Sequence, residues 1–291
     1  MDGAPAHNKV CNIEDFADPG LREIIRDVLA VETARRGDAF PEGREYRKHW
    51  EVAMAVRALE AGGALREDAE LLGVGAGNEP TLFYLTNVVR RVFSTDLYLA
   101  GGEWEESASA PMLTDPGQFY TAPWRERRLV VQHMDALHLR YDNDTFDGLF
   151  SSSSLEHFGG LAEVRQALDE MHRVLKPGAI LSLSTEYRLA GPPPGIPGVL
   201  LFDRREIIED LGLADGDRWT ALDPLRTDVS NATRATTQPY EETGADVRNH
   251  VARHGGLYFE RLEWSRYPHL VLRDGLSAWT SVHVALRKRT S

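Results

Sequence analysis

The chain has 291 residues, of which 42% are hydrophobic and 27% are charged, and this composition excludes wholesale disorder. The 33 basic and 45 acidic residues give a net charge of −12. This charge argues against a general nucleic-acid binder, because phosphate contacts need a basic face, although it leaves room for a small basic patch. The single cysteine, Cys11, excludes an intrachain disulfide and fits a cytoplasmic protein. The first residues lack a signal-peptide pattern and no apolar run approaches a membrane span, so we expect no membrane partner.

The N-terminal part of the chain predicts helices that follow a loose arm over residues 1–18. Apolar residues at helical spacing predict one helix over residues 21–36 and a second over residues 44–61. Trp50 lies on the second helix, where we expect it to pack in the core. We therefore predict that residues 1–66 form an N-terminal arm and helical cap.

From residue 70 onward, short apolar runs alternate with helical patterns, as in a parallel, doubly wound sheet that is covered on both faces. The predicted strands are residues 70–74, 92–95, 129–132, 146–151 and 179–185. The predicted helices are residues 80–89 and 161–175, followed by a turn at 176–178.

Two segments interrupt this alternation. Residues 100–125 form a long insertion with four aromatic residues, which is either a lid or a surface connector. Residues 191–198 are rich in proline and glycine and can form neither a helix nor a central strand. Beyond them, residues 269–272 and 280–286 predict two further strands.

A glycine-rich turn joins the first predicted strand to the next helix. Gly73, Gly75 and Gly77 permit a tight turn and let a ligand approach the backbone closely. The helix that follows favours an anionic group at its start. A dinucleotide-binding loop would place its third glycine at position 78, where this chain has Asn78. The turn therefore suits a ligand that carries a carboxylate in place of a pyrophosphate, and the alternative is a tight turn without a ligand.

Two carboxylates follow the next two strands. Asp96 lies 19 residues after Gly77, where it can accept hydrogen bonds from both hydroxyls of a ribose. Asp135 could accept a hydrogen bond from an adenine amine, with Met134 and Ala136 lining the base. For both aspartates, the alternative is a structural role in a turn.

These segments together resemble a known family. The segments Gly73–Gly77, Asp96, Met134–Ala136, Phe146–Ser151 and Arg173–Gly178 are similar to the successive motifs of class I S-adenosylmethionine-dependent methyltransferases. More narrowly, they resemble the small-molecule group called methyltransferase type 11. The resemblance covers residues 69–187.

The resemblance implies a Rossmann-like, doubly wound α/β fold with a seven-stranded sheet whose last strand is antiparallel. It implies a methyltransferase domain over residues 67–291, in which residues 69–187 are the core and residues 188–291 shape the acceptor site. It also implies S-adenosyl-L-methionine as the cofactor. The predicted cofactor-binding residues are Gly73, Gly75, Gly77, Asn78, Asp96, Leu97, Met134, Asp135, Ala136, Ser151 and Ser152.

The segment after the fourth strand holds the candidate catalytic residue. Ser151 and Ser152 stand where the family passes the methionine end of the cofactor, with turn capping as the alternative. His157 can take a proton from an oxygen or nitrogen acceptor, and its alternative is a structural histidine. Glu156 could orient His157 or cap the next helix, and Glu186 is a further carboxylate at this edge.

The sequence therefore predicts a methyltransferase that acts on an oxygen or nitrogen of a small molecule, such as a sugar or another secondary metabolite. The alternatives are a nicotinamide-dependent oxidoreductase and a methyltransferase-like protein that binds without turnover. We expect no metal and no nucleic-acid partner, and the sequence leaves the oligomeric state open, with a homodimer as one option.

Overall fold

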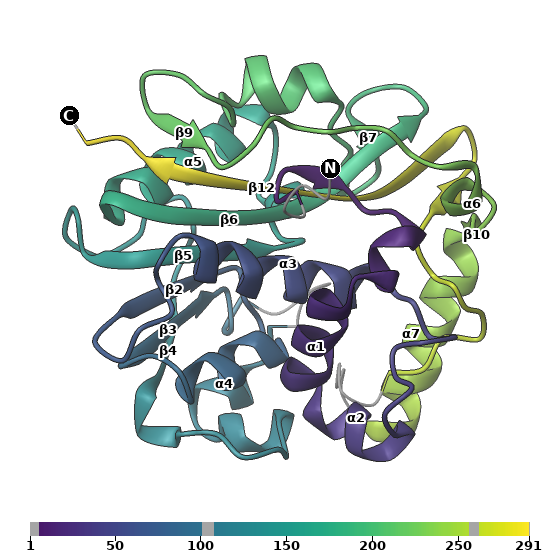
Figure 1. Ribbon diagram of the computed structural model, residues 1–291, viewed down its shortest axis with the longest axis horizontal. Coiled ribbons are helices and arrows are strands. Elements are labelled where there is room, and N and C mark those ends of the chain that lie inside the picture. Colours follow the sequence, from purple (N-terminus) through teal and green to yellow (C-terminus); the bar gives the residue numbers. More distant parts are fainter. Residues whose placement is uncertain (1–5, 101–107, 256–261, 291) are drawn as a thin grey trace.

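The computed structural model describes residues 6–100, 108–255 and 262–290. Within these residues, ten strands form one sheet whose main path runs β10-β11-β12-β6-β5-β2-β3-β4 (Figure 1). The parallel strands are β4 (Leu129–His133), β3 (Arg91–Asp96), β2 (Glu70–Val74), β5 (Phe146–Ser152) and β6 (Leu175–Ala190). The last strand, β12 (Ser277–Lys288), runs antiparallel to β6. The predicted Rossmann-like sheet with an antiparallel last strand is thus confirmed.

The far edge of β12 carries several short strands. Along this edge β12 pairs in turn with β11 (Leu272–Asp274), β1 (Lys9–Val10) and β9 (Trp219–Ala221). The two-residue strand β10 (Gln238–Pro239) then pairs with β11. Strands β1, β9 and β10 enlarge the predicted sheet of seven strands to the ten that the described residues form.

Helices cover both faces of the sheet, because neighbouring residues of a strand point to opposite sides. Leu71 packs with residues of α3 (Arg47–Ala61) and α4 (Pro80–Thr86) on one face. Leu72 packs with residues of α5 (Leu161–Val174) on the other. Strands buried on both faces have almost continuous apolar sequences, which is why the pattern alone located them.

The N-terminal segment differs from the prediction in two ways. Residues 6–18 are held against the sheet, since β1 pairs with β12 and the side chain of Asn8 donates to the carbonyl of Asp223 at 2.6 Å (Figure 1). The predicted helix over residues 21–36 is two helices, α1 (Pro19–Val28) and α2 (Ala30–Arg36). They meet at Leu29, whose φ of −100° and ψ of 46° are not helical. Trp50 is fully buried, as predicted.

Two strand predictions need correction. Residues 176–178 form an irregular stretch inside β6 rather than a turn before it, and the register with β5 shifts there. The first C-terminal strand begins at Leu272 and not at residue 269. The backbone N–H of His269 instead donates to the carbonyl of Glu45 at 2.7 Å, so this part of the chain pairs with the segment before α3.

The two interrupting segments are ordered where the structure describes them. Residues 108–125 contain two short 3-10 helices, Ala110–Leu113 and Pro116–Phe119, and pack on α4, where the ring of Tyr120 stacks on Phe83 at 5.0 Å. Residues 101–107, which include Trp104, lie outside the described residues. The proline-rich segment forms a small separate hairpin of β7 (Gly195–Ile196) and β8 (Val199–Leu200).

The C-terminal part of the described chain also contains a π-helix at Glu206–Asp210 and the helices α6 (Asn231–Arg234) and α7 (Tyr240–His254). Among the helices that the structure describes, none is both long and apolar enough to cross a bilayer.

Candidate functional site

The carboxyl ends of the parallel strands bring most of the predicted site residues to one edge of the sheet. The glycine turn follows β2, and Asp96 ends β3. Asp135 follows β4, whereas Ser151 and Ser152 end β5. Parallel strands share their carboxyl edge, which is where open α/β sheets bind ligands.

The glycine turn depends on its glycines for two different reasons. Gly75 and Gly77 have φ values of +61° and +47°, which other residues adopt at a cost. A Cβ atom on Gly75 would also lie 2.6 Å from Cβ of Ser154. Gly73 has an ordinary φ, but a Cβ there would lie 2.9 Å from the ring of Phe150 in the core. The turn therefore has no space for side chains at Gly73 or Gly75.

Asp96 fastens the glycine turn to the neighbouring strand. Its Oδ2 accepts a hydrogen bond from the N–H of Gly77 at 2.8 Å, and its Oδ1 accepts one from the N–H of Leu97 at 2.7 Å. Burial raises the pKa of Asp96, and these two hydrogen bonds act against that rise. Leu97, which follows it, is 46% exposed although it is a large apolar residue. Each carboxylate oxygen keeps a lone pair with which it can bind a ligand.

The turn after β4 gives Asp135 a structural partner. Oδ1 of Asp135 accepts a hydrogen bond from the N–H of Leu137 at 2.9 Å, so the alternative role in a turn is present. Met134 is buried and Ala136 packs against the core beside it. The exposed carboxylate of Asp135 can still accept a further hydrogen bond, and its contact with adenine stays a prediction.

The four serines after β5 divide into two pairs. Ser153 and Ser154 are bonded within the protein: Ser153 Oγ donates to Oε2 of Glu51 at 2.7 Å, and Ser154 Oγ donates to the carbonyl of Gly75 at 2.5 Å. The hydroxyls of Ser151 and Ser152 are enclosed, but neither has a hydrogen-bond partner among the described residues. Buried hydroxyls are nearly always bonded, so these two are suited to a ligand.

His157 is held in one tautomer by the proline-rich hairpin. Its Nδ1 lies 3.0 Å from the carbonyl of Gly198, and a carbonyl can only accept, so Nδ1 carries the proton. Nε2 is then the basic nitrogen of the neutral ring, and it lies 4.0 Å from Oε1 of Glu156. Glu156 in turn accepts a hydrogen bond from Thr185 at 2.7 Å. Glu156 therefore stands beside His157 and does not cap the next helix, where Glu163 takes that position.

A buried charge network, formed by Arg47, Lys48, Glu51 and Glu186, joins α3 to the ends of β6 and β12. Arg47 Nη1 donates to both carboxylate oxygens of Glu186, at 2.6 and 2.8 Å, and to Oγ of Ser281 at 3.1 Å. Lys48 Nζ lies 3.1 Å from Oε1 of Glu51 and 3.2 Å from Oε1 of Glu186. Burial acts to raise the pKa of Glu186, but Arg47 and Lys48 hold it below its usual range.

Glu186, the further carboxylate predicted at this edge, belongs to the charge network. Both of its oxygens are engaged by Arg47 and Lys48. Sequence reasoning did not single out Arg47 or Lys48. The available signal was three charged residues at positions i, i+1 and i+4 of a helix whose other residues are largely buried.

Sequence reasoning also missed Glu79, which follows Asn78 in the glycine turn. Its Oε1 is enclosed and has no hydrogen-bond partner among the described residues. Burial, followed by the nearby charge of Glu51, raises the pKa of Glu79 to about 8. A buried carboxyl with an unbonded oxygen is costly in a folded protein, and such groups cluster at functional sites.

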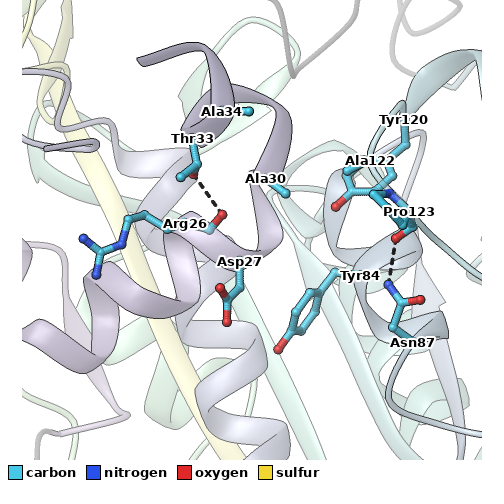
Figure 2. Close-up of a pocket in the computed structure, with 10 residues that line it drawn as sticks. All are labelled: Arg26, Asp27, Ala30, Thr33, Ala34, Tyr84, Asn87, Tyr120, Ala122 and Pro123. Atoms are coloured by element: carbon cyan, nitrogen blue, oxygen red, sulfur yellow. Dashed lines mark hydrogen bonds between the residues drawn. The ribbon is translucent and has the colours of Figure 1, made fainter. Parts of the chain in front are cut away.

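One groove on the described residues lies elsewhere. It has a volume of about 470 Å³ and lies between α1, α2, α4 and residues 120–123. Figure 2 shows Tyr84 of α4 and Asn87, which follows α4, facing Asp27, Ala30 and Thr33 across this groove. Asn87 is bonded there to the carbonyl of Pro123 at 2.9 Å. None of the predicted cofactor or catalytic residues lines the groove.

Comparisons with known proteins define the class of the chain. It superposes on the crystal structure of the [4+2]-cyclase SpnF with a TM-score of 0.52 and 19% identity, over 99% of this chain and 100% of that one. A proposed sarcosine dimethylglycine methyltransferase from Galdieria sulphuraria gives a TM-score of 0.51 and 13% identity, over 82% and 85% of the two chains. At these identities the likeness shows a shared fold. No curated protein matches the sequence.

The family model described as a methyltransferase domain matches residues 72–183, which run from β2 into β6. These residues are therefore a methyltransferase domain within the longer chain.

Proposed function

We propose that the protein transfers a methyl group from S-adenosyl-L-methionine to an oxygen or nitrogen of a small-molecule acceptor at the carboxyl edge of β2, β3 and β5. The observation that supports this best is the alignment along one edge of the glycine turn, Asp96, the two unbonded hydroxyls of Ser151 and Ser152, and the oriented base His157. An electrophilic methyl donor needs mainly to be aligned with its acceptor, and this edge offers fixed groups for both.

The residues present fit the cofactor. We assign the ribose to Asp96, the methionine end to Gly73, Gly75, Gly77, Asn78, Ser151 and Ser152, and the adenine to Leu97, Met134, Asp135 and Ala136. The exposed apolar side chain of Leu97 supports this assignment, since an aliphatic group beside the ribose ligand can cover a base. When bound, the cofactor supplies a methyl group on a positively charged sulfur.

His157 is assigned as the general base. The cofactor would supply a methyl group whose leaving sulfur keeps the electrons of the carbon–sulfur bond, and Nε2 of His157 would take the acceptor's proton. The hydrogen bond to Gly198 keeps Nε2 unprotonated in the neutral ring, and Glu156 stabilises the charge that then develops. This base is needed for a hydroxyl or a charged amine, whereas a carbon acceptor would need a different activation.

The acceptor site is assigned to the part of the chain outside the core domain. The hairpin of β7 and β8 holds His157, and the N-terminal end of α7 brings Tyr240 near the charge network. These contacts support the division into an N-terminal cap over residues 1–66 and a domain over residues 67–291 whose part 188–291 shapes the acceptor site. We further propose a cytoplasmic protein without nucleic-acid or membrane partners, given its acidic charge and single cysteine.

The test is methyl transfer from S-adenosyl-L-methionine with an isotopically labelled methyl group to a panel of sugars, phenols and amines. Labelled O- or N-methyl product is expected with at least one acceptor. The shared fold of a [4+2]-cyclase makes it necessary to measure labelled product and not only conversion of the acceptor. His157→Ala and His157→Phe should each lower kcat by about 100-fold while binding S-adenosylhomocysteine normally. Unchanged turnover in both variants would remove His157 as the base.

A further inference from the structure

Glu79 lies in the glycine turn of the candidate site, where the residue is partly exposed but one carboxylate oxygen is enclosed. This oxygen, Oε1, has no hydrogen-bond partner among the described residues. The N–H of Glu79 donates to the carbonyl of Ala76 at 3.1 Å, which holds its backbone in the turn. Buried polar atoms are nearly always bonded, so a bound group would be a natural partner for Oε1.

The groups that face Glu79 come from three elements. Lys48 and Glu51 approach from α3, Asp96 from the end of β3 and Ser152 from the end of β5. Burial and the charge of Glu51 raise the pKa of Glu79 to about 8, whereas Ser152 and Lys48 act in the opposite direction. Because Lys48 already lies against Glu51 and Glu186, it does not supply Glu79 with a full counter-charge. Glu79 therefore keeps its proton to a higher pH than an ordinary carboxyl does.

The neighbours of Glu79 suggest that it lies near the methionine end of the cofactor. It is influenced both by Asp96, to which we assigned the ribose, and by Ser152, to which we assigned the methionine end. The portion of S-adenosyl-L-methionine between and beyond these points carries a sulfonium and an ammonium group. Both are cations, and an enclosed carboxyl is the group that favours them most when it ionises.

We propose that Glu79 is the counter-ion of the cationic methionine end of the cofactor and that it releases its proton to solvent when this cation binds. The proposal rests on the cofactor site assigned above. After methyl transfer the sulfonium has become a neutral thioether, so the ionised carboxyl loses one of its attractions. Glu79 thereby favours the methyl donor over the product S-adenosylhomocysteine.

The experiment is calorimetric titration of the full chain and of Glu79→Gln with three ligands. These are S-adenosyl-L-methionine, S-adenosylhomocysteine and 5′-methylthioadenosine, which has neither the ammonium nor the sulfonium. The variant should bind S-adenosyl-L-methionine at least about tenfold more weakly and 5′-methylthioadenosine as the wild type does. The loss should be larger for S-adenosyl-L-methionine than for S-adenosylhomocysteine, and an equal loss would overturn the claim that Glu79 favours the methyl donor.

Proton release is measured by repeating the titration at pH 7 in two buffers with different ionisation enthalpies. Wild-type protein should release a fraction of one proton per bound S-adenosyl-L-methionine, and Glu79→Gln should not. Affinity of the wild type should rise with pH and level off near pH 8, because the free protein binds the proton that the complex has lost. The matched control is Glu70→Gln, at the opposite end of β2, which should change none of these values.

The outcomes separate the two proposals. If wild-type protein binds none of the three ligands, the proposed function is wrong. If it binds S-adenosyl-L-methionine but Glu79→Gln binds it equally well, or releases the same proton, the inference about Glu79 is wrong. An equal loss of 5′-methylthioadenosine would also overturn it, because the damage would then extend to the adenosine site.

Discussion

Two neighbouring regions at the carboxyl edge of the sheet differ in whether their buried polar groups are bonded within the protein. In the charge network, Arg47 and Lys48 engage both Glu186 and Glu51, so its charges are matched within the protein. Around the glycine turn, enclosed oxygens of Glu79, Ser151 and Ser152 have no partner among the described residues. The charges of the first region are paired within the protein, whereas the second region holds oxygens that a ligand could bind.

This difference predicts opposite effects on stability. Removing one member of a buried ion pair leaves the charge of its partner uncompensated, so the protein should lose stability. Removing a buried group that has no partner should cost nothing, or should stabilise the empty protein. The following variants test which buried polar groups are bonded within the protein and which are not.

The largest effect is expected from Arg47→Met. It leaves Glu186 and Glu51 buried with only Lys48 as a partner, and the free energy of unfolding should fall by about 3–5 kcal/mol. The measurement is urea unfolding at pH 7. The double variant Arg47→Met with Glu186→Leu removes the stranded charge and should regain more than half of the loss. A single variant as stable as wild type would show that the network is not closed.

An intermediate effect is expected from Gly75→Ala. The new Cβ would meet Cβ of Ser154 at 2.6 Å in a left-handed conformation, so the free energy of unfolding should fall by about 3 kcal/mol. Gly63→Ala is the matched control, since Gly63 has a φ of +76° and open space around it. It should cost about 1 kcal/mol, and only Gly75→Ala should also lose binding of S-adenosylhomocysteine. Equal losses in both variants would mean that the close contact at Gly75 is unimportant.

The last effect has the opposite sign and is expected from Glu79→Gln in the absence of ligand. Folding raises the pKa of Glu79 from its usual 4.5 to about 8, so the wild type loses stability as the pH rises through this interval. The variant lacks this loss. Its Tm should therefore exceed that of wild type at pH 8.5, and by less at pH 5. A Tm difference that does not change with pH, or a less stable variant at pH 8.5, would show that Glu79 has a bonding partner within the protein.

The sequence predicted the parts of the fold that depend on local patterns. The strands β2, β3, β4 and β5 were located from their apolar runs to within one or two residues. The glycine turn and Asp96 were found because a strand, a turn and a carboxylate at this spacing have few other uses. The break at Leu29 and the irregular start of β6 were missed, since neither interrupts the hydrophobic pattern.

The groups that distinguish the two regions could not be predicted, because they depend on contacts across the chain. Arg47 and Glu186 are separated by 139 residues, and nothing local shows that either is buried. Glu79 is an ordinary polar residue of a turn until its neighbours from α3, β3 and β5 enclose it. Periodicity reports which face of an element is buried, and it does not report which charges meet there.

The central claim is that the unbonded groups around the glycine turn form the site for the cofactor. Calorimetric titration of the wild-type chain with S-adenosylhomocysteine, and separately with NAD, tests this most directly. We predict saturable one-to-one binding of S-adenosylhomocysteine, weakened at least about tenfold by Asp96→Ala, and no binding of NAD. Tight binding of NAD without binding of S-adenosylhomocysteine would contradict the account.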